Sequence, residues 1–375
     1  MTALHNERPA PSDLEERLIQ LIVDHGPIRV GDFMTDALNH PQHGYYSTQQ
    51  ALGAAGDFTT SPEISQVFGE LVGSWLVHAW EEMGAPSAFN LVELGPGRGT
   101  LMADILRVAK VRPRFLSSVH VYMIEASGRM RYQQKRRLHE TGVRITWADR
   151  LEDVPPGPML LAANEFFDCL PIRQFVRTAD TDDRPWRERL VGVTDGPQKR
   201  LAFVLSESRF ADQPGMPPGA QPESVFESCS VGQEVVAEIA HRFREHKGRA
   251  LIIDYGHGRS GYADTLQAVK GHKPWPVLET PGLADVTAHV DFAALARRAR
   301  QEDMRVDGPI RQADFLERMG LHLRLGAIEK SMENDQKRED FRSGALRLID
   351  RSGMGNLFKV MAISPKGTPA APGFE

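Results

Sequence analysis

Three glycines and one acidic residue stand close together in the segment 91–100, Leu-Val-Glu-Leu-Gly-Pro-Gly-Arg-Gly-Thr. Its apolar start is typical of a buried strand, and the glycines that follow are typical of a tight turn into a helix. Strand, glycine turn and helix make the first half of a nucleotide-binding βαβ unit. Because Gly95, Gly97 and Gly99 lack side chains, the backbone of this turn can approach a ligand closely. The alternative is a turn with only a structural role.

The spacing of the glycines distinguishes between nucleotide cofactors. A dinucleotide fold expects G-x-G-x-x-G, whereas Thr100 occupies the position of the third glycine and the pattern here is G-x-G-x-G. With Glu93 just before the first glycine, the segment resembles motif I of class I S-adenosylmethionine (SAM) methyltransferases. SAM has no phosphate, and its amino-acid end has a carboxylate and an ammonium. The N–H groups of Gly99 and Thr100 can hold the carboxylate, and Glu93 can balance positive charge nearby.

Two further acidic residues stand at the ends of predicted strands. Glu125 ends the apolar segment 119–124, and Asp149 follows the segment 143–147. Ligands of an open parallel sheet bind beyond the carboxyl ends of the strands. We therefore predict that Glu125 accepts hydrogen bonds from the two ribose hydroxyls of the cofactor and that Asp149 meets the adenine amine. The alternative for each is a solvated acid at a strand end.

The candidate catalytic residues are Asn164, Glu165 and Asp168, which follow the apolar segment 159–163. Methyl transfer from a sulfonium is an in-line displacement, so orientation of the substrate provides much of the rate. An arginine substrate stays protonated, so carboxylates must grip its guanidinium, orient one nitrogen and help a proton to leave. We predict that Glu165 and Asp168 do this together. The alternative is that Asn164 caps a turn and that both acids are partly exposed loop residues.

The elements expected around these residues form an α/β protein with a Rossmann-like, mostly parallel sheet. Residues 1–86 are predicted to form a helical N-terminal cap, with a long helix that begins at Ser61 and Pro62. Residues 87–375 are predicted to form the methyltransferase core, interrupted by an α/β insertion over 172–248. Strands are expected in the core at 91–94, 119–125, 143–147, 159–163, 250–256 and 357–363, and in the insertion at 173–177, 188–193 and 201–205.

Composition narrows the class of protein. With 375 residues, of which 41% are hydrophobic, the chain can bury a large core in one domain or two. A formal net charge of −5 gives no basic surface for nucleic acid, and no apolar run has the length of a membrane-spanning helix. Cys169 and Cys229 have no metal-ligand spacing, so we expect no bound metal and a reducing compartment. The first residues lack the apolar run of a signal peptide and are too acidic for a typical transit peptide, so we expect a cytoplasmic protein, in which an oligomer is possible.

Five blocks spread over nearly the whole chain resemble the signature segments of the MidA-like methyltransferase family, and we identify the chain as a bacterial-type member. That family includes the mitochondrial complex I assembly methyltransferase. The resemblance implies a SAM-dependent enzyme that methylates an arginine side chain of a protein, with symmetric dimethylation of a complex I subunit as the mitochondrial activity. The blocks are 56–63, 93–100, 164–171, 253–257 and 285–292.

The resemblance also assigns roles that the residues alone do not indicate. It makes the first block a cover over the cofactor, with Asp57, Thr59 and Ser61 near SAM. His257 and His289 lie in shared blocks as well, and either is a candidate to face the site. A lone histidine is a natural general base near neutral pH, and the alternative is a histidine that is hydrogen-bonded in a structural turn.

Two other functions fit parts of the sequence. A binding module or assembly chaperone would keep the fold and bind SAM without catalysis, and the intact glycine turn and Glu125 favour a retained cofactor in that case. A nicotinamide or flavin oxidoreductase would use a similar βαβ unit, but Thr100 in place of the third glycine weighs against it.

Overall fold

A central eight-stranded sheet carries the cavity described below. The computed structural model describes residues 10–48, 59–179 and 183–375. In the order β15-β16-β10-β5-β2-β3-β4, with β14 beside β10, β16 runs antiparallel to both of its neighbours, and all other neighbouring strands are parallel. The expected α/β class with a mostly parallel sheet is confirmed. The strands are β2 (Phe89–Leu94), β3 (Val119–Ile124), β4 (Ile145–Ala148), β5 (Met159–Asn164), β10 (Gly248–His257), β14 (Val290–Asp291), β15 (Met304–Arg311) and β16 (Phe358–Pro365).

The strand order reverses between β2 and β5. From β2 the chain continues to β3 and β4 on one side, whereas β5 and β10 lie on the other. In open parallel sheets, ligands bind outside the carboxyl ends of the strands at such a reversal. The glycine turn after β2 and the loop after β5 therefore lie side by side at this edge of the sheet.

Helices cover both faces of the sheet because its central strands are apolar on both sides. Leu91, Leu160 and Leu251 pack into one cluster, and the next residues along the same strands pack into the other. The helices of the core are α4 (Ser61–Ile64), α5 (Gln66–Glu82), α6 (Thr100–Val108), α7 (Pro113–Ser118), α8 (Gly128–Leu138), α9 (Ser230–Glu245), α10 (Phe292–Gln301), α11 (Gln312–Arg318), α12 (Leu321–Glu329), α13 (Asp335–Arg347) and α14 (Met354–Leu357), with short 3-10 turns at Ala109–Val111 and Leu151–Asp153.

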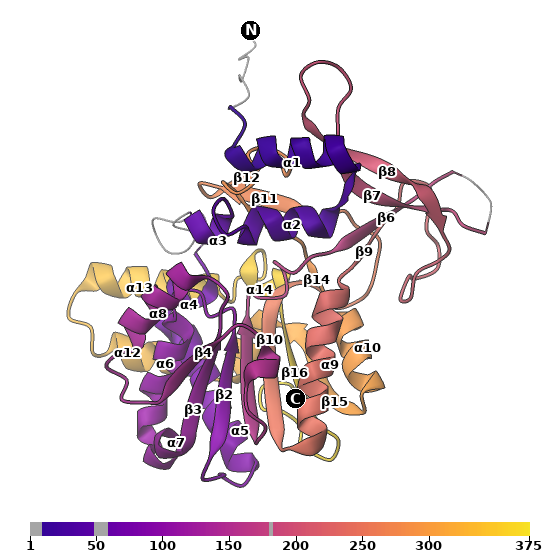
Figure 1. Cartoon of the computed structure of the whole chain (residues 1–375). Coiled ribbons are helices and arrows are strands. Elements are labelled where there is room, and N and C mark those ends of the chain that lie inside the picture. Colours follow the sequence, from indigo (N-terminus) through magenta and orange to yellow (C-terminus); the bar gives the residue numbers. More distant parts are fainter. Residues whose placement is uncertain (1–9, 49–58, 180–182) are drawn as a thin grey trace.

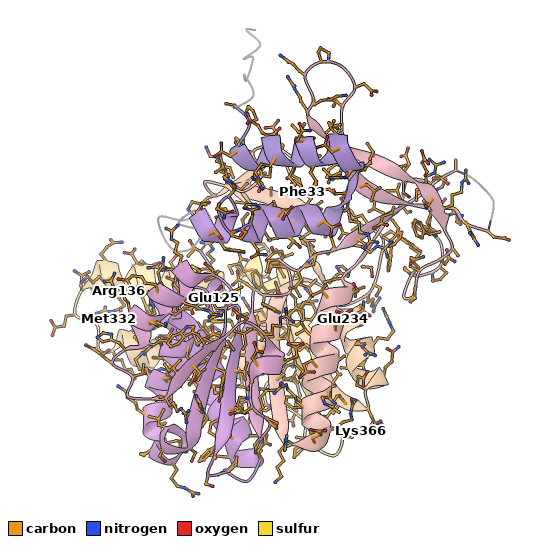
Figure 2. The ribbon with its side chains drawn as sticks, in the orientation of Figure 1. Phe33, Glu125, Arg136, Glu234, Met332 and Lys366 are labelled. Atoms are coloured by element: carbon orange, nitrogen blue, oxygen red, sulfur yellow. The ribbon has the colours of Figure 1, made fainter. Side chains whose placement is uncertain are left out.

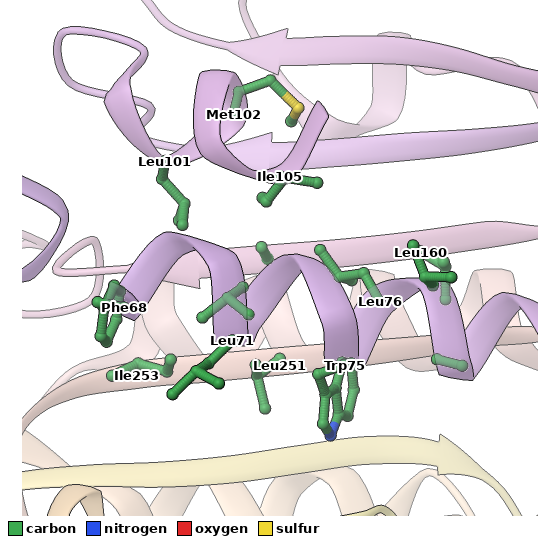
Figure 3. Packing of buried hydrophobic residues seen from close by; sticks show 14 of the residues in the cluster. Phe68, Leu71, Trp75, Leu76, Leu101, Met102, Ile105, Leu160, Leu251 and Ile253 are labelled. Carbon is green, nitrogen blue, oxygen red and sulfur yellow. The ribbon is translucent and has the colours of Figure 1, made fainter. Parts of the chain in front are cut away.

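Helix α5 packs against the sheet, although it lies within the range 1–86 expected for the cap. Phe68, Leu71 and Trp75 of α5 lie in the same buried cluster as Leu251 and Ile253 of β10 (Figure 3). The single long helix expected from Ser61 is divided. Ser65 is extended, with φ −155°, and its hydroxyl accepts the N–H of Val67, so α4 ends there and α5 begins.

A cap lies over the carboxyl ends of the strands (Figure 1). It consists of α1 (Asp13–His25), α2 (Val30–Asn39) and α3 (Tyr45–Thr48), which share a buried cluster with the insertion and with a small three-stranded sheet. The two residues of β1 (Ile28–Arg29) pair with β7. The insertion strands are β6 (Arg173–Arg177), β7 (Trp186–Val193), β8 (Leu201–Phe210) and β9 (Val225–Ser228), and the small sheet is formed by β11 (Gln267–Lys270), β12 (Lys273–Trp275) and β13 (Asp285–Thr287).

The cap therefore combines segments that are distant in sequence. The small sheet β11–β13 lies outside the expected insertion, whereas α9, which lies inside the range 172–248, packs on the central sheet through Val236, Ile239 and Phe243. In the part of the chain that the structure describes, no helix is long and apolar enough to cross a membrane.

Candidate active site

A cavity of about 700 Å³ lies between the carboxyl ends of the strands and the cap. Glu125 and Glu234 both line this cavity, and Figure 2 shows them below the cap helices. The volume suits a ligand of nucleoside size. Of the residues predicted to form the site, those that line the cavity are Glu93, Gly95, Gly97, Glu125, Asp149, Asn164, Glu165 and Asp168.

The remaining predicted residues lie beside the cavity or outside the described residues. The Gly99 N–H donates to the Pro96 carbonyl (2.7 Å) and the Ser61 N–H donates to Glu165 (2.9 Å), and both acceptor residues line the cavity. Thr59 precedes Ser61 in the chain and does not line the cavity. Asp57 falls in the segment 49–58, outside the described residues.

The glycine turn is built on left-handed backbone. Gly97 has φ +50° and lines the cavity, whereas Gly99 has φ +77° and stands at the N-cap of α6. A Cβ at Gly99 would make an ordinary contact of 3.5 Å with Gln134, so it is the left-handed backbone of the turn, and not packing, that favours glycine here. The first residues of α6, Thr100 and Leu101, line the cavity, and the N–H groups at the start of a helix are suited to bind a carboxylate.

Gln134 connects the glycine turn to Glu125, a role that no motif in the sequence indicates. Its buried side-chain amide donates to the Gly97 carbonyl (2.7 Å) and to Glu125 Oε2 (3.0 Å), and accepts from the Trp147 indole N–H (2.8 Å). Glu125 Oε1 accepts the N–H of Ser127 (2.8 Å). Burial raises the pKa of Glu125. The network holds this carboxylate in one orientation at the end of β3, and its predicted contact with ribose hydroxyls stays a prediction.

Glu93 places a buried carboxylate at the wall of the cavity, and its surroundings show which ligand the cavity fits. The residue is 3% exposed, and its Oε2 has no hydrogen-bond partner among the described residues. Burial, and the nearby charge of Glu125, raise its pKa. A buried carboxylate without a cation is costly, and the ammonium and sulfonium groups of SAM are cations that would compensate it. The buried carboxylate at this end of the cavity therefore fits the cationic groups of SAM.

Asp149 lies on the rim of the cavity. Its side chain is 71% exposed and is paired with Arg131 (2.6 Å). The position is compatible with the predicted contact to adenine, which stays a prediction.

The loop after β5 places two carboxylates at the other end of the cavity. Glu165 has φ +52°, and its Oε1 accepts from the N–H of Ser61 (2.9 Å) and from the Asn164 amide (3.0 Å). Burial raises the pKa of Glu165 to about 7, and the neighbouring Asp168 acts in the same direction. Asp168 is 7% exposed, and burial raises its pKa to about 6. The alternative of an exposed loop acid therefore does not describe Asp168.

Asp254, which follows the last residue of β10 that pairs with β5, holds this loop in shape. Its Oδ2 accepts the consecutive N–H groups of Phe166 (3.1 Å), Phe167 (2.9 Å) and Asp168 (3.3 Å), while Oδ1 accepts the N–H of Tyr255 (2.9 Å). The residue is fully buried. Burial and the neighbouring carboxylates of the loop raise its pKa, whereas the N–H donors favour the ionised form.

We expect the substitution Asp254→Asn to lower the free energy of unfolding by about 2 kcal/mol, because one amide oxygen cannot replace two accepting oxygens and a donor would face buried N–H groups. Urea denaturation followed by circular dichroism measures the change. Asp195→Asn, in the exposed loop between β7 and β8, is the control and should leave the midpoint unchanged. An unchanged midpoint for Asp254→Asn contradicts this role.

Helix α4 joins the two ends of the cavity. The Ser61 N–H binds Glu165, and the Glu63 carboxylate accepts from the Thr100 hydroxyl and from Arg98 (3.4 Å). The segment that begins at residue 59 therefore contacts the loop after β5 and the glycine turn at once.

His257 and His289 line a separate cavity of about 40 Å³ and do not line the larger one. His257 Nε2 lies 4.0 Å from Asp291 Oδ1, and the His289 ring packs edge-on against Tyr255, with ring centroids 5.6 Å apart. Burial lowers the pKa of His289. Within residues 10–48, 59–179 and 183–375, no group of His, Cys, Asp and Glu side chains is arranged to hold a metal ion.

Comparisons with known proteins agree with this geometry. Residues 71–310 match the family described as S-adenosyl-L-methionine-dependent methyltransferase. The chain is 34% identical to the mitochondrial protein arginine methyltransferase NDUFAF7 of Xenopus tropicalis, over 97% of this chain and 89% of the relative. It is 38% identical to the Drosophila melanogaster homolog, over 94% of this chain and 85% of the relative.

A solved structure shows the same fold. The crystal structure of a Burkholderia thailandensis protein bound to S-adenosyl-homocysteine is 25% identical to the chain, with a TM-score of 0.80 over 98% of this chain and 97% of that one. These similarities decide against the nicotinamide or flavin oxidoreductase. The chain belongs to the family of S-adenosyl-L-methionine-dependent methyltransferases, and SAM is its cofactor.

Proposed function

We propose that the protein transfers the methyl group of SAM to an arginine side chain of a protein substrate. The observation that carries the proposal is the pair of carboxylates Glu165 and Asp168 at one end of the SAM-sized cavity. Among the described residues, no Lys, Arg or His forms an ion pair with either of them. A guanidinium is the planar cation that such a pair binds best. The relatives named protein arginine methyltransferase support the same substrate.

SAM supplies a methyl group on a sulfonium, and the chain's residues must bring one guanidinium nitrogen in line with it. We assign this orientation to Glu165 and Asp168, with the Asn164 amide fixing Glu165 (3.0 Å). As the nitrogen forms its bond to the methyl carbon, the S–C bond breaks and its electron pair stays on sulfur. The nitrogen then loses one proton, for which a carboxylate with a raised pKa is a suitable acceptor.

At the cofactor end, we assign Glu93 to the ammonium, Glu125 to the ribose hydroxyls and Asp149 to adenine. Gly95 and Gly97 allow close approach of the backbone. We assign indirect roles to three predicted residues that do not line the cavity, Gly99, Thr59 and Ser61. Gly99 shapes the start of α6, and the segment of Thr59 and Ser61 leads into α4 and contacts Glu165.

We expect the rate of methyl transfer to rise as the pH passes through about 6 and about 7, where Asp168 and Glu165 ionise. Glu165 lies near the carboxylates of Asp168 and Asp254, so a bound guanidinium stabilises its ionised form. The stability of the ligand-free protein depends on pH in the opposite direction. Both folded pKa values exceed those of the unfolded chain, so these groups stabilise the protein fully at low pH and lose that contribution as the pH rises through the folded values.

The dependence of kcat/KM on pH, measured with an arginine peptide, tests this expectation, and thermal unfolding without ligand tests the stability term. A kcat/KM that stays flat through this window would contradict the role of the two carboxylates.

The proposed function is tested with SAM that carries a labelled methyl group and a lysate of cells that lack the protein. Labelled bands are digested, and mass spectrometry locates the methylated residue and distinguishes symmetric from asymmetric dimethylarginine. A respiratory complex I subunit is the first purified substrate to test, given the resemblance noted above. Label on arginine that disappears when that arginine is replaced by lysine supports the proposal. Tight SAM binding without label on any protein would favour the assembly chaperone.

A further inference from the structure

We propose that the Arg98 guanidinium binds the carboxylate of SAM, with Glu63 of α4 holding the guanidinium in place, and that this contact selects cofactors that carry a carboxylate. The contact involves the cofactor of the family alone, so it does not depend on the arginine substrate of the proposed function. It adds a charged side chain to a turn in which the sequence indicates only backbone N–H groups as donors to this carboxylate.

Arg98 is one of two basic residues at the 700 Å³ cavity. Of the described residues that line it, Arg98 and Arg150 are the only Lys, Arg or His, whereas acidic residues line it at both ends, among them Glu93, Glu125 and Asp168. A ligand carboxylate in such acidic surroundings needs a cation, because removal from water and nearby like charges both disfavour its ionised form. The two arginines are therefore the candidates to bind it.

The order of the strands favours Arg98 over Arg150. Arg98 follows β2 inside the glycine turn, whereas Arg150 follows β4, two strands further along the sheet in the order β2-β3-β4. Neighbouring strands lie about 4.8 Å apart, so roughly 10 Å separates the ends of β2 and β4. The ammonium of SAM is assigned to Glu93 of β2, and the carboxylate is bonded to the same carbon as that ammonium. It is therefore expected beside Arg98.

Most N–H donors of the Arg98 guanidinium are unused. Within residues 10–48, 59–179 and 183–375, its single polar contact joins Nη1 to Glu63 Oε2 at 3.4 Å. A guanidinium has five N–H donors, and its charge-assisted hydrogen bonds are usually shorter, at about 2.7–2.9 Å. The Arg98 side chain is 33% exposed, whereas that of Glu63 is 15% exposed. The guanidinium can therefore accept a second, ligand carboxylate while its protein partner stays largely enclosed.

Glu63 fixes the position of this guanidinium. Its carboxylate accepts from Arg98 and from the Thr100 hydroxyl, so it connects α4 to the residues on both sides of Gly99. Thr100 and Leu101 line the cavity at the start of α6, where the helix N–H groups favour an anion. A carboxylate bound at this turn can therefore accept from the Arg98 side chain and from the start of α6 together.

The test compares S-adenosylhomocysteine with its decarboxylated counterpart, in which a hydrogen atom replaces the carboxylate and the ammonium is kept. Isothermal titration calorimetry with the full protein measures the dissociation constant of each ligand. For the wild type we expect S-adenosylhomocysteine to bind at least roughly tenfold more tightly, because only its carboxylate can accept from Arg98. In Arg98→Gln we expect this preference to fall by roughly tenfold or more, because the acidic cavity then favours the ligand without a carboxylate.

Matched variants separate the charge of Arg98 from its effect on structure. The decarboxylated ligand should bind Arg98→Gln at least as tightly as it binds the wild type, which shows that the cavity is intact. Arg150→Gln removes the other cation of the lining and should keep the wild-type preference. Glu63→Gln should lower the preference by roughly twofold or more, because Arg98 is then held less firmly. Arg98→Met is the second neutral variant, with the same expected loss, should Arg98→Gln not fold.

Two results would overturn this contact. One is a wild type that binds both ligands equally well, and the other is a neutral Arg98 variant that weakens both ligands equally or neither. Both measurements use the cofactor product without any arginine substrate, so they leave the proposed function untouched. Conversely, a failure to methylate arginine would leave the preference for the carboxylate unchanged.

Discussion

The substitution Glu165→Gln is expected to lower kcat for methyl transfer by roughly 100-fold or more while SAM binds as tightly as in the wild type. The amide keeps an oxygen that accepts the N–H of Ser61 and the Asn164 amide, so the loop should keep its shape. It removes the negative charge that orients the guanidinium and the group that accepts its proton. Single-turnover kinetics with an arginine substrate measure the rate, and calorimetric titration measures SAM binding.

Glu234→Gln is the matched control for this change, because Glu234 lines the same cavity from α9 but is exposed. It should transfer methyl groups at the wild-type rate. If Glu165→Gln does so as well, Glu165 has no part in the reaction, and Asp168 becomes the remaining candidate for the proton acceptor.

The second large effect is expected at the cofactor end, where Gly97→Val should lower the affinity for SAM by roughly 100-fold or more. Gly97 lines the cavity with φ +50°, so a branched side chain meets two obstacles. It occupies space that the ligand needs, and it strains a left-handed backbone at a cost of about 1–3 kcal/mol. Calorimetric titration with SAM measures the affinity, and thermal unfolding measures the strain.

Gly142→Val separates these two effects. Gly142 has a similar φ of +67°, but no atom lies within 4 Å of a Cβ built there. We expect it to lose similar stability and to bind SAM like the wild type. A folded Gly97→Val protein with unchanged SAM affinity would remove the glycine turn from the cofactor site.

Much of the cofactor end follows from local sequence. A strand that ends in an acidic residue or a glycine turn is visible in Leu91 to Gly99 and at Glu125, because strand, turn and helix are adjacent in the chain. The rule that parallel strands present their carboxyl ends at one edge then brings these residues together. For the same reason Asn164, Glu165 and Asp168 could be placed at the cavity before their contacts were known.

The groups that hold these residues in place are encoded by long-range contacts. In the sequence, Asp254 is an acidic residue inside a predicted strand with no indicated role, and only the pairing of β10 with β5 brings it to the N–H groups of the loop. Gln134 is a polar residue in a basic helix, where periodicity does not reveal its bonds to Gly97 and Glu125. The small sheet β11–β13 consists of short strands in a segment rich in turn residues, which offers no clear pattern.

The cap has a consequence for how the chain is made. Its first helix is anchored by a hydrogen bond from the Ser12 hydroxyl to the Pro281 carbonyl, across 269 positions of sequence, and β1 pairs with a strand of the insertion. At roughly 5–20 residues per second, a ribosome needs on the order of 15–50 s to make the missing partners. Until then, the buried cluster of α1 and α2 lacks the part that the small sheet and its flanking segments contribute, which includes Ala268, Ala284 and Val286. Helices α1 and α2 are therefore made long before the cap around them is complete, and we expect nascent chains to depend on chaperones during this interval.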